Sequence, residues 1–188
     1  YVYYENQPSA VGGFWQFRND GTPTVWESLK VLFIGNSFTY YNDMPQLFGQ
    51  IASGAGELVE VHSIVHGSYT LEKYADPNDV AAPTDDVTMQ GCGQIVDQTL
   101  RASDDYDVVI LQEQSTRPVT NYNSFVESAR TLKEKIGETQ KDCEVYLYAT
   151  WGFPAGLDST YATIPDLEAA IRQAYKNAAA EIGASVSN

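Results

Sequence analysis

The chain has 188 residues, which suits a single domain with a sizeable hydrophobic core. Its formal net charge is −14. A charge of this sign argues against nucleic acid as a partner, because phosphate binding needs clustered lysine and arginine, and against an anionic membrane surface. It is compatible with a neutral substrate such as a carbohydrate ester.

Two cysteines, Cys92 and Cys143, are too few for a disulfide framework and show no metal-ligand spacing, so we expect unpaired thiols. No apolar run reaches the ~20 residues that span a bilayer, and no signal peptide is visible. The chain begins at Tyr1 rather than at methionine, which leaves room for a trimmed export signal. A secreted or periplasmic location is slightly favoured, and no oligomeric state is indicated.

Residues 1–29 differ from the rest, because aromatic residues are scattered among Gly, Pro, Asn and Gln without a clean period. We expect an irregular lead-in whose aromatic rings pack on the domain formed by residues 30–188. A sugar-stacking surface is the alternative, although buried aromatic rings are commoner. The aromatic residues are Tyr1, Tyr3, Tyr4, Phe14, Trp15, Phe17 and Trp26.

From residue 31 onward, apolar runs that predict strands alternate with segments of helical periodicity. Asp43, with Gln46 three residues later and Pro45 between them, predicts a capping box for the first helix. Residues 184–188 resemble the start of a fifth strand, and we expect the natural domain to continue beyond them. The expected strands are 31–35, 58–65, 107–111 and 144–150, and the expected helices are 44–54, 91–102, 122–136 and 165–182.

This alternation predicts a three-layer α/β/α sandwich with a parallel sheet. If the strand order is flavodoxin-like, 2-1-3-4-5, the binding crevice lies at the carboxyl ends of the first and third strands.

The tripeptide Gly35-Asn36-Ser37 directly follows the first strand. We expect Ser37 on a short turn between strand and helix, where a nucleophile is exposed. The alternative is a turn serine that bonds only to nearby backbone.

Polar or glycine-containing loops follow the other expected strands and open on the same edge. Acyl transfer needs a nucleophile, a base and donors for the oxyanion. Ser37 supplies the first, and the N–H groups of Ser37 and Gly67, with the side-chain amide of Gln114, supply the donors. Asn36, Gln112 and Trp151 are expected to line the pocket, although the glutamine amides would also serve to tie loops together.

The segment 33–39, Phe-Ile-Gly-Asn-Ser-Phe-Thr, resembles the first block of the SGNH (GDSL-like) hydrolases, and in particular an uncharacterised bacterial branch with a GNSF-type block. The resemblance spans about residues 30–186. It implies that Ser37 is the nucleophile and first oxyanion donor. It also implies that Gly67 is the glycine of the family's second conserved block. The third block, Gly-x-Asn-Asp in typical members, reads Gln112-Glu113-Gln114-Ser115 here, so Gln114 would replace the asparagine donor.

The last block of that family, Asp-x-x-His, does not occur in the 188 residues. His62 falls within a strand pattern, and His66 at the strand end next to Gly67 is a substitute base only as an alternative. We expect the aspartate and histidine to lie beyond Asn188.

The sequence therefore predicts a serine esterase that hydrolyses small acyl esters, with acetyl esters of carbohydrates implied by the family resemblance. The alternative is a non-catalytic carbohydrate- or ligand-binding module on the same scaffold. A flavodoxin-like ligand binder is a third hypothesis, but the loop after the first strand lacks a Ser/Thr/Gly-rich phosphate cradle. No metal site or cofactor is indicated.

Overall fold

A computed structural model of the chain describes residues 28–81, 91–102 and 105–187. The lead-in expected at 1–29 lies outside these residues except for its last two positions, so its interpretation stays a prediction.

Five parallel strands form one sheet in the order β2-β1-β3-β4-β5, which confirms the predicted flavodoxin-like order. The interior strand β1 pairs with both β2 and β3. A parallel sheet buried on both faces needs near-continuous apolar runs, and residues 31–34 of β1 are all fully buried. The strands are β1 (Leu29–Gly35), β2 (Val59–Val65), β3 (Val108–Leu111), β4 (Glu144–Tyr148) and β5 (Ser185–Ser187).

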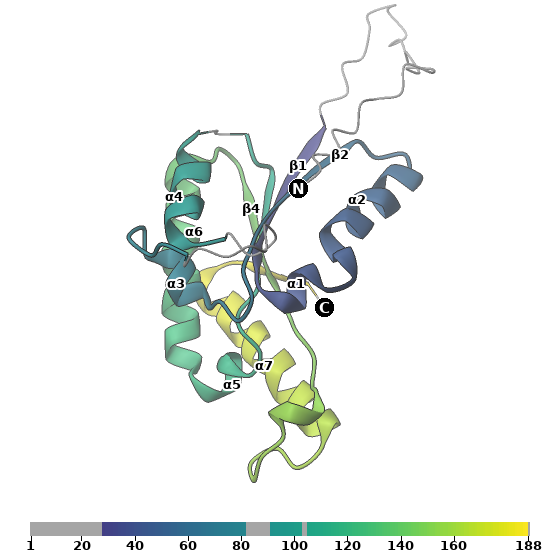
Figure 1. Cartoon of the computed structure of the whole chain (residues 1–188), viewed down its shortest axis with the longest axis vertical. Coiled ribbons are helices and arrows are strands. Elements are labelled where there is room, and N and C mark those ends of the chain that lie inside the picture. The colour runs from purple at the N-terminus through teal and green to yellow at the C-terminus, as the bar shows by residue number, and fades with distance from the viewer. Residues whose placement is uncertain (1–27, 82–90, 103–104, 188) are drawn as a thin grey trace, which may run out of the picture.

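Helices cover both faces of the sheet, as the three-layer prediction required. Figure 1 shows α2 on one side of the sheet and α4 and α6 on the other. On the α2 side, the rings of Phe33 and Phe48 meet edge to face with centroids 5.6 Å apart. The long helices are α2 (Met44–Gly54), α4 (Gly93–Ala102), α6 (Tyr122–Thr139) and α7 (Ile164–Ile182).

The main hydrophobic core lies between the sheet and helices α4, α6 and α7. Alternate strand residues point into it, because successive side chains of a strand face opposite ways. This core includes Leu32, Ile34, Val109, Leu111, Leu147, Val96, Leu100, Phe125, Leu132, Leu167, Ile171 and Tyr175.

Two helix boundaries differ from the sequence prediction. Asp43 does not cap α2 through its side chain, because its backbone is left-handed (φ 56°) rather than extended. Asn42 has a φ of 55° as well, so the chain turns sharply before α2. Helix α6 was expected to end at Gly137 but continues to Thr139.

Short helices occupy segments in which the sequence pattern predicted no helix. Ser37 lies in α1 (Ser37–Tyr40) rather than on an open turn, and the 3-10 turn η1 (Tyr41–Asp43) follows it. Three more short elements are α3 (Leu71–Ala75), α5 (Arg117–Thr120) and η3 (Pro154–Gly156). All are five residues or shorter, a length at which helical periodicity cannot be recognised.

Both cysteines are free thiols, Cys92 buried and Cys143 half-buried. Among the helices of the described residues, none combines the length and apolar character needed to cross a membrane.

Candidate active site

Three loops meet beyond the carboxyl ends of the neighbouring strands β2, β1 and β3. Gly35 pairs with Val65, and Ser37 and Gly67 each follow two residues later. Ile34 pairs with Leu111, and Gln114 lies as far beyond Leu111 as Ser37 lies beyond Ile34. The order of the sheet reverses between β1 and β3, which is where open α/β sheets bind ligands.

Backbone hydrogen bonds continue the ladder past the strand ends. The Gln112 N–H donates to the Ile34 carbonyl at 2.9 Å, and the His66 N–H donates to the Gly35 carbonyl at 3.3 Å. The loops are therefore held in register as they leave the sheet.

Ser37 is the first residue of α1 and is half-buried. Asn36 caps this helix, with its side-chain oxygen accepting from the Phe38 N–H at 3.1 Å. Within the described part of the chain, no hydrogen bond engages the Ser37 hydroxyl. The hydroxyl is therefore not held in place by a described residue.

Asn36 and Gln112 point into the protein, where each is only 1% exposed. The Asn36 amide donates to the Tyr69 carbonyl at 2.8 Å. Gln112 Oε1 accepts from the Asn36 N–H at 2.9 Å and from the Thr39 hydroxyl at 2.8 Å, and its amide nitrogen donates to the Glu113 carbonyl. The Asn36 side chain thus ties the first loop to the loop after β2, and the Gln112 side chain ties the first loop to the loop after β3.

Gln114 is half-buried at the start of the loop after β3. Its side-chain nitrogen donates to Ser115 Oγ at 2.9 Å, which uses one of its two hydrogens. Ser115 has a φ of 37°, and Ser68 in the loop after β2 has a φ of 61°. Left-handed backbone at non-glycine residues is costly and concentrates at functional sites.

The two histidines have different surroundings. His62 is exposed on β2, where its ring contacts the Tyr106 hydroxyl at 2.6 Å and Glu60 at 2.9 Å. His66 Nδ1 lies 3.0 Å from the Gly67 carbonyl, which can only accept, so Nδ1 carries the proton of the neutral ring. Nε2 is then the basic nitrogen of His66.

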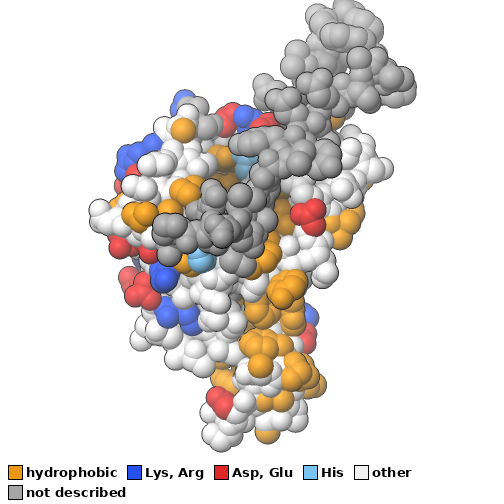
Figure 2. All heavy atoms as spheres, viewed as in Figure 1, with side chains coloured by type: hydrophobic (Ala, Val, Ile, Leu, Met, Phe, Trp, Pro, Cys, Tyr) orange, Lys and Arg blue, Asp and Glu red, His pale blue; other side chains and the backbone are white. Residues whose placement is uncertain are grey.

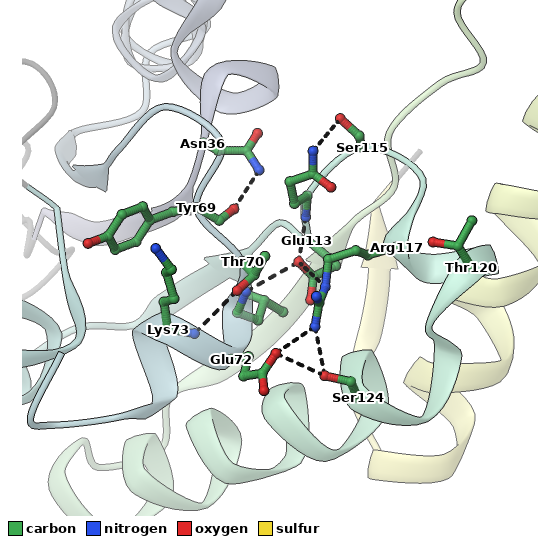
Figure 3. A network of polar contacts seen from close by, with 12 residues as sticks. Asn36, Tyr69, Thr70, Glu72, Lys73, Glu113, Ser115, Arg117, Thr120 and Ser124 are labelled. Carbon is green, nitrogen blue, oxygen red and sulfur yellow. Dashed lines mark hydrogen bonds and ion pairs between the residues drawn. The ribbon is translucent and has the colours of Figure 1, made fainter. Parts of the chain in front are cut away.

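Glu113 is a charged residue of this region that the sequence analysis did not single out. Its side chain is 0% exposed, and its Oε1 accepts from the backbone N–H groups of Gln114 at 2.6 Å and Leu71 at 3.3 Å (Figure 3). Burial raises the pKa of Glu113 to about 7, against the opposing effects of the Gln114 N–H and of Arg117. The sequence signal for this residue was a carboxylate two residues beyond an apolar strand, with an arginine four residues later.

Aromatic rings border the first loop. The Phe38 ring lies 4.7 Å from Trp151 and 5.5 Å from Phe153, measured between ring centroids. Trp151 is 43% exposed, and Figure 2 shows apolar side chains gathered over α1 and over the segment between β4 and α7. This surface offers an aromatic platform beside Ser37.

Across residues 28–81, 91–102 and 105–187, no group of three or more His, Cys, Asp or Glu side chains is placed to hold a metal ion.

No protein-family model matches the sequence, and no curated protein matches it significantly. Solved structures do match. One is a protein from Slackia heliotrinireducens, provisionally assigned as an SGNH hydrolase, with a TM-score of 0.65 and 23% identity over 85% of this chain and 78% of the other.

Two further structures are similar. A DUF4886 family protein from Bacteroides uniformis has a TM-score of 0.60 and 20% identity over 85% of this chain and 66% of the other. A carbohydrate acetylesterase family member from Sinorhizobium meliloti has a TM-score of 0.53 and 13% identity over 85% of this chain and 82% of the other. The chain therefore has the α/β fold of the SGNH hydrolases, as its first block indicated.

Proposed function

We propose that this protein is a serine hydrolase that cleaves small acyl esters, with Ser37 as the nucleophile. The observation that carries the proposal is the Ser37 hydroxyl just beyond the carboxyl end of β1, flanked by the loops that follow β2 and β3 and not hydrogen-bonded by any residue that the structure describes. Similar folds occur in esterases, including the carbohydrate acetylesterase family member from Sinorhizobium meliloti.

In the proposed reaction, Ser37 Oγ attacks the ester carbonyl carbon while a base takes its proton. The negative charge that develops on the carbonyl oxygen needs donors that are already in position. We assign this role to the N–H groups of Ser37 and Gly67 and to the second hydrogen of the Gln114 amide. The alcohol leaves with a proton, and water then hydrolyses the acyl-enzyme.

The base has two candidate sources. His66 lies next to Gly67 with Nε2 as its basic nitrogen. An Asp-x-x-His pair of the SGNH type does not occur in residues 1–188, so a histidine of that type would have to come from outside them. Replacing His66 by alanine distinguishes the sources: an activity that persists in the natural protein assigns the base elsewhere, and a lost activity assigns it to His66.

For the substrate we propose acetyl esters of carbohydrates. The ring platform of Phe38, Trp151 and Phe153 suits the apolar face of a sugar, and Trp151 is exposed enough to contact one. A net charge of −14 also favours a neutral substrate over an anionic one.

The test is hydrolysis of an activated acetyl ester such as p-nitrophenyl acetate. Ser37→Ala should lower the rate by about a thousandfold or more, because the nucleophile and its base act as a unit. Ser53→Ala, on an exposed position of α2, is the matched control and should leave the rate unchanged. Full activity in Ser37→Ala would refute the proposal.

A non-catalytic binding module is the second candidate, favoured by the lack of an Asp-x-x-His pair in these 188 residues. Calorimetric titration with an acetylated oligosaccharide separates the two functions. Binding that survives in Ser37→Ala, without turnover by the unmodified protein, would support the module.

A further inference from the structure

Glu113 is the buried carboxylate next to Gln114, and the proposed reaction does not use it. Its side chain is 0% exposed, so a bound substrate would not touch it. Any effect of Glu113 on the reaction must therefore act through its neighbours.

The contacts of Glu113 reach three parts of the fold. Its Oε1 accepts from the Gln114 N–H at 2.6 Å and from the Leu71 N–H at the start of α3 at 3.3 Å. Its own N–H donates to the Tyr175 hydroxyl of α7 at 3.0 Å. One residue thus joins the loop after β3 to the α3 region and to the core helix α7.

The charged and titratable groups around the carboxylate come from α5, α3 and α7. Arg117 Nε lies 3.8 Å from Glu113 Oε1, while Arg117 Nη2 contacts Glu72 and Ser124 at 2.7 Å each (Figure 3). Tyr175 is the third neighbour. Within the described ranges no residue hydrogen-bonds to Glu113 Oε2, so the hydrogen bonds that position the carboxylate there are those of Oε1.

We propose that Glu113 is a positioning residue of the site: by accepting from the Gln114 and Leu71 N–H groups, its Oε1 fixes the Gln114 backbone and so aims the Gln114 side-chain amide at the oxyanion. This proposal rests on the proposed function. Loss of the acceptor would leave two N–H groups unpaired and free the loop after β3, while the Ser37 loop keeps its own contacts with Gln112.

The test compares Glu113→Ala and Glu113→Gln in the ester assay. Glu113→Ala should lower kcat about ten- to a hundredfold with KM changed less than about threefold, since a misplaced oxyanion donor acts on the transition state. Glu113→Gln should recover most of kcat, because its amide oxygen accepts the same two bonds. Glu72→Gln changes the exposed carboxylate on the same arginine and is the matched control, with kcat unchanged within about twofold.

A double mutant identifies the route of the effect. If Glu113 acts through Gln114, Glu113→Ala should cost nothing further in a Gln114→Ala background. An equal loss in both backgrounds, or a Glu113→Ala enzyme with the kcat of the unmodified protein, would overturn the proposal.

If Glu113→Ala does not fold, Glu113→Asp replaces it. The shorter carboxylate keeps the charge but withdraws the acceptor, so its kcat should fall below that of Glu113→Gln. The opposite order would overturn the proposal.

A spectroscopic readout does not depend on turnover. The amide proton resonances of Gln114 and Leu71 should shift together as Glu113 titrates, and this shared shift should vanish in Glu113→Gln. If the unmodified protein shows no Ser37-dependent hydrolysis, the proposed function fails, while the amide titration still decides whether Glu113 holds the loop. Amides that do not respond would overturn the positioning role.

Discussion

Each residue of the segment 35–39 has its own physical task. Gly35 leaves space for Thr39 and Gln112, Asn36 caps α1, and the Thr39 hydroxyl bonds to Gln112. The Phe38 ring leans on Trp151. Among the described residues, none hydrogen-bonds to the Ser37 side chain, which agrees with the nucleophile role proposed for it.

Gly35→Ala should destabilise the protein by about 2–3 kcal/mol. An added Cβ would lie 2.2 Å from Thr39 Oγ1 and 2.7 Å from Gln112 Oε1, and both groups are buried and hydrogen-bonded to each other. Urea unfolding measures the effect. Gly54→Ala is the control, because a Cβ there meets nothing within 4 Å, and it should be neutral or stabilising by less than about 1 kcal/mol. Equal stabilities for the two variants would contradict the packing argument.

Glu113 should make the unfolding free energy pH-dependent. Burial raises its pKa from 4.5 to about 7, so between these values the folded chain holds a proton that the unfolded chain has released. The unfolding free energy should therefore fall as pH rises across this interval, by about 3 kcal/mol at 1.36 kcal/mol per pKa unit.

Glu113→Gln lacks this proton and serves as the reference in that experiment. Urea unfolding of both proteins at about pH 5 and about pH 8 gives the difference, in which the other ionisable groups cancel. The unmodified protein should lose stability relative to Glu113→Gln as pH rises. Parallel pH curves would show that the carboxylate is not perturbed.

At the scale of elements, a residue that the sequence suggests as a helix cap acts as one only where its backbone conformation allows it. Gly183 directly follows the expected helix 165–182 and ends α7 in a left-handed conformation (φ 66°). Asp43 failed as a cap because the sharp turn after α1 places it in a left-handed conformation. The sequence showed an Asp-x-x-Gln pattern but not the short helix before it, and that helix decides the backbone of Asp43.

Thr163→Ala should lower the stability of the protein by about 1 kcal/mol. The Thr163 side chain accepts from the Asp166 N–H at 3.3 Å and donates to the Asp166 carboxylate at 2.6 Å. One N–H group of the first turn of α7, which has no partner within the helix, is thereby hydrogen-bonded. The midpoint of urea unfolding measures the loss. Thr131→Ala, on an exposed position inside α6, should be neutral or slightly stabilising, since alanine is the better helix former. A larger loss at Thr131 than at Thr163 would contradict the capping role.

At the scale of the whole molecule, the register of the strands was not predicted, but a parallel sheet covered by helices, with the flavodoxin-like strand order, was predictable because apolar runs alternate with helical segments. This was enough to bring the loops of Ser37, Gly67 and Gln114 to one edge. The direction in which individual side chains point could not be predicted from the sequence. Gln112 and Asn36 turn inward because each finds buried partners in another loop, and a contact between residues 36 and 112 leaves no trace in local periodicity.

The net charge of −14 should set a salt-dependent preference among substrates. A negative surface potential lowers the local concentration of an anionic ester but not of a neutral one, and added salt screens it. Between about 10 mM and about 300 mM salt, kcat/KM for an anionic ester, such as a p-nitrophenyl ester with a terminal carboxylate, should rise about two- to fivefold. The neutral p-nitrophenyl acetate is the control and should change little. If the anionic ester is instead hydrolysed faster at low salt, the local electrostatic potential at Ser37 is positive. Lys73 in α3 and Arg117 in α5 are cations of the segments that follow β2 and β3, and charge-neutralising variants of these two would then locate the source of that potential.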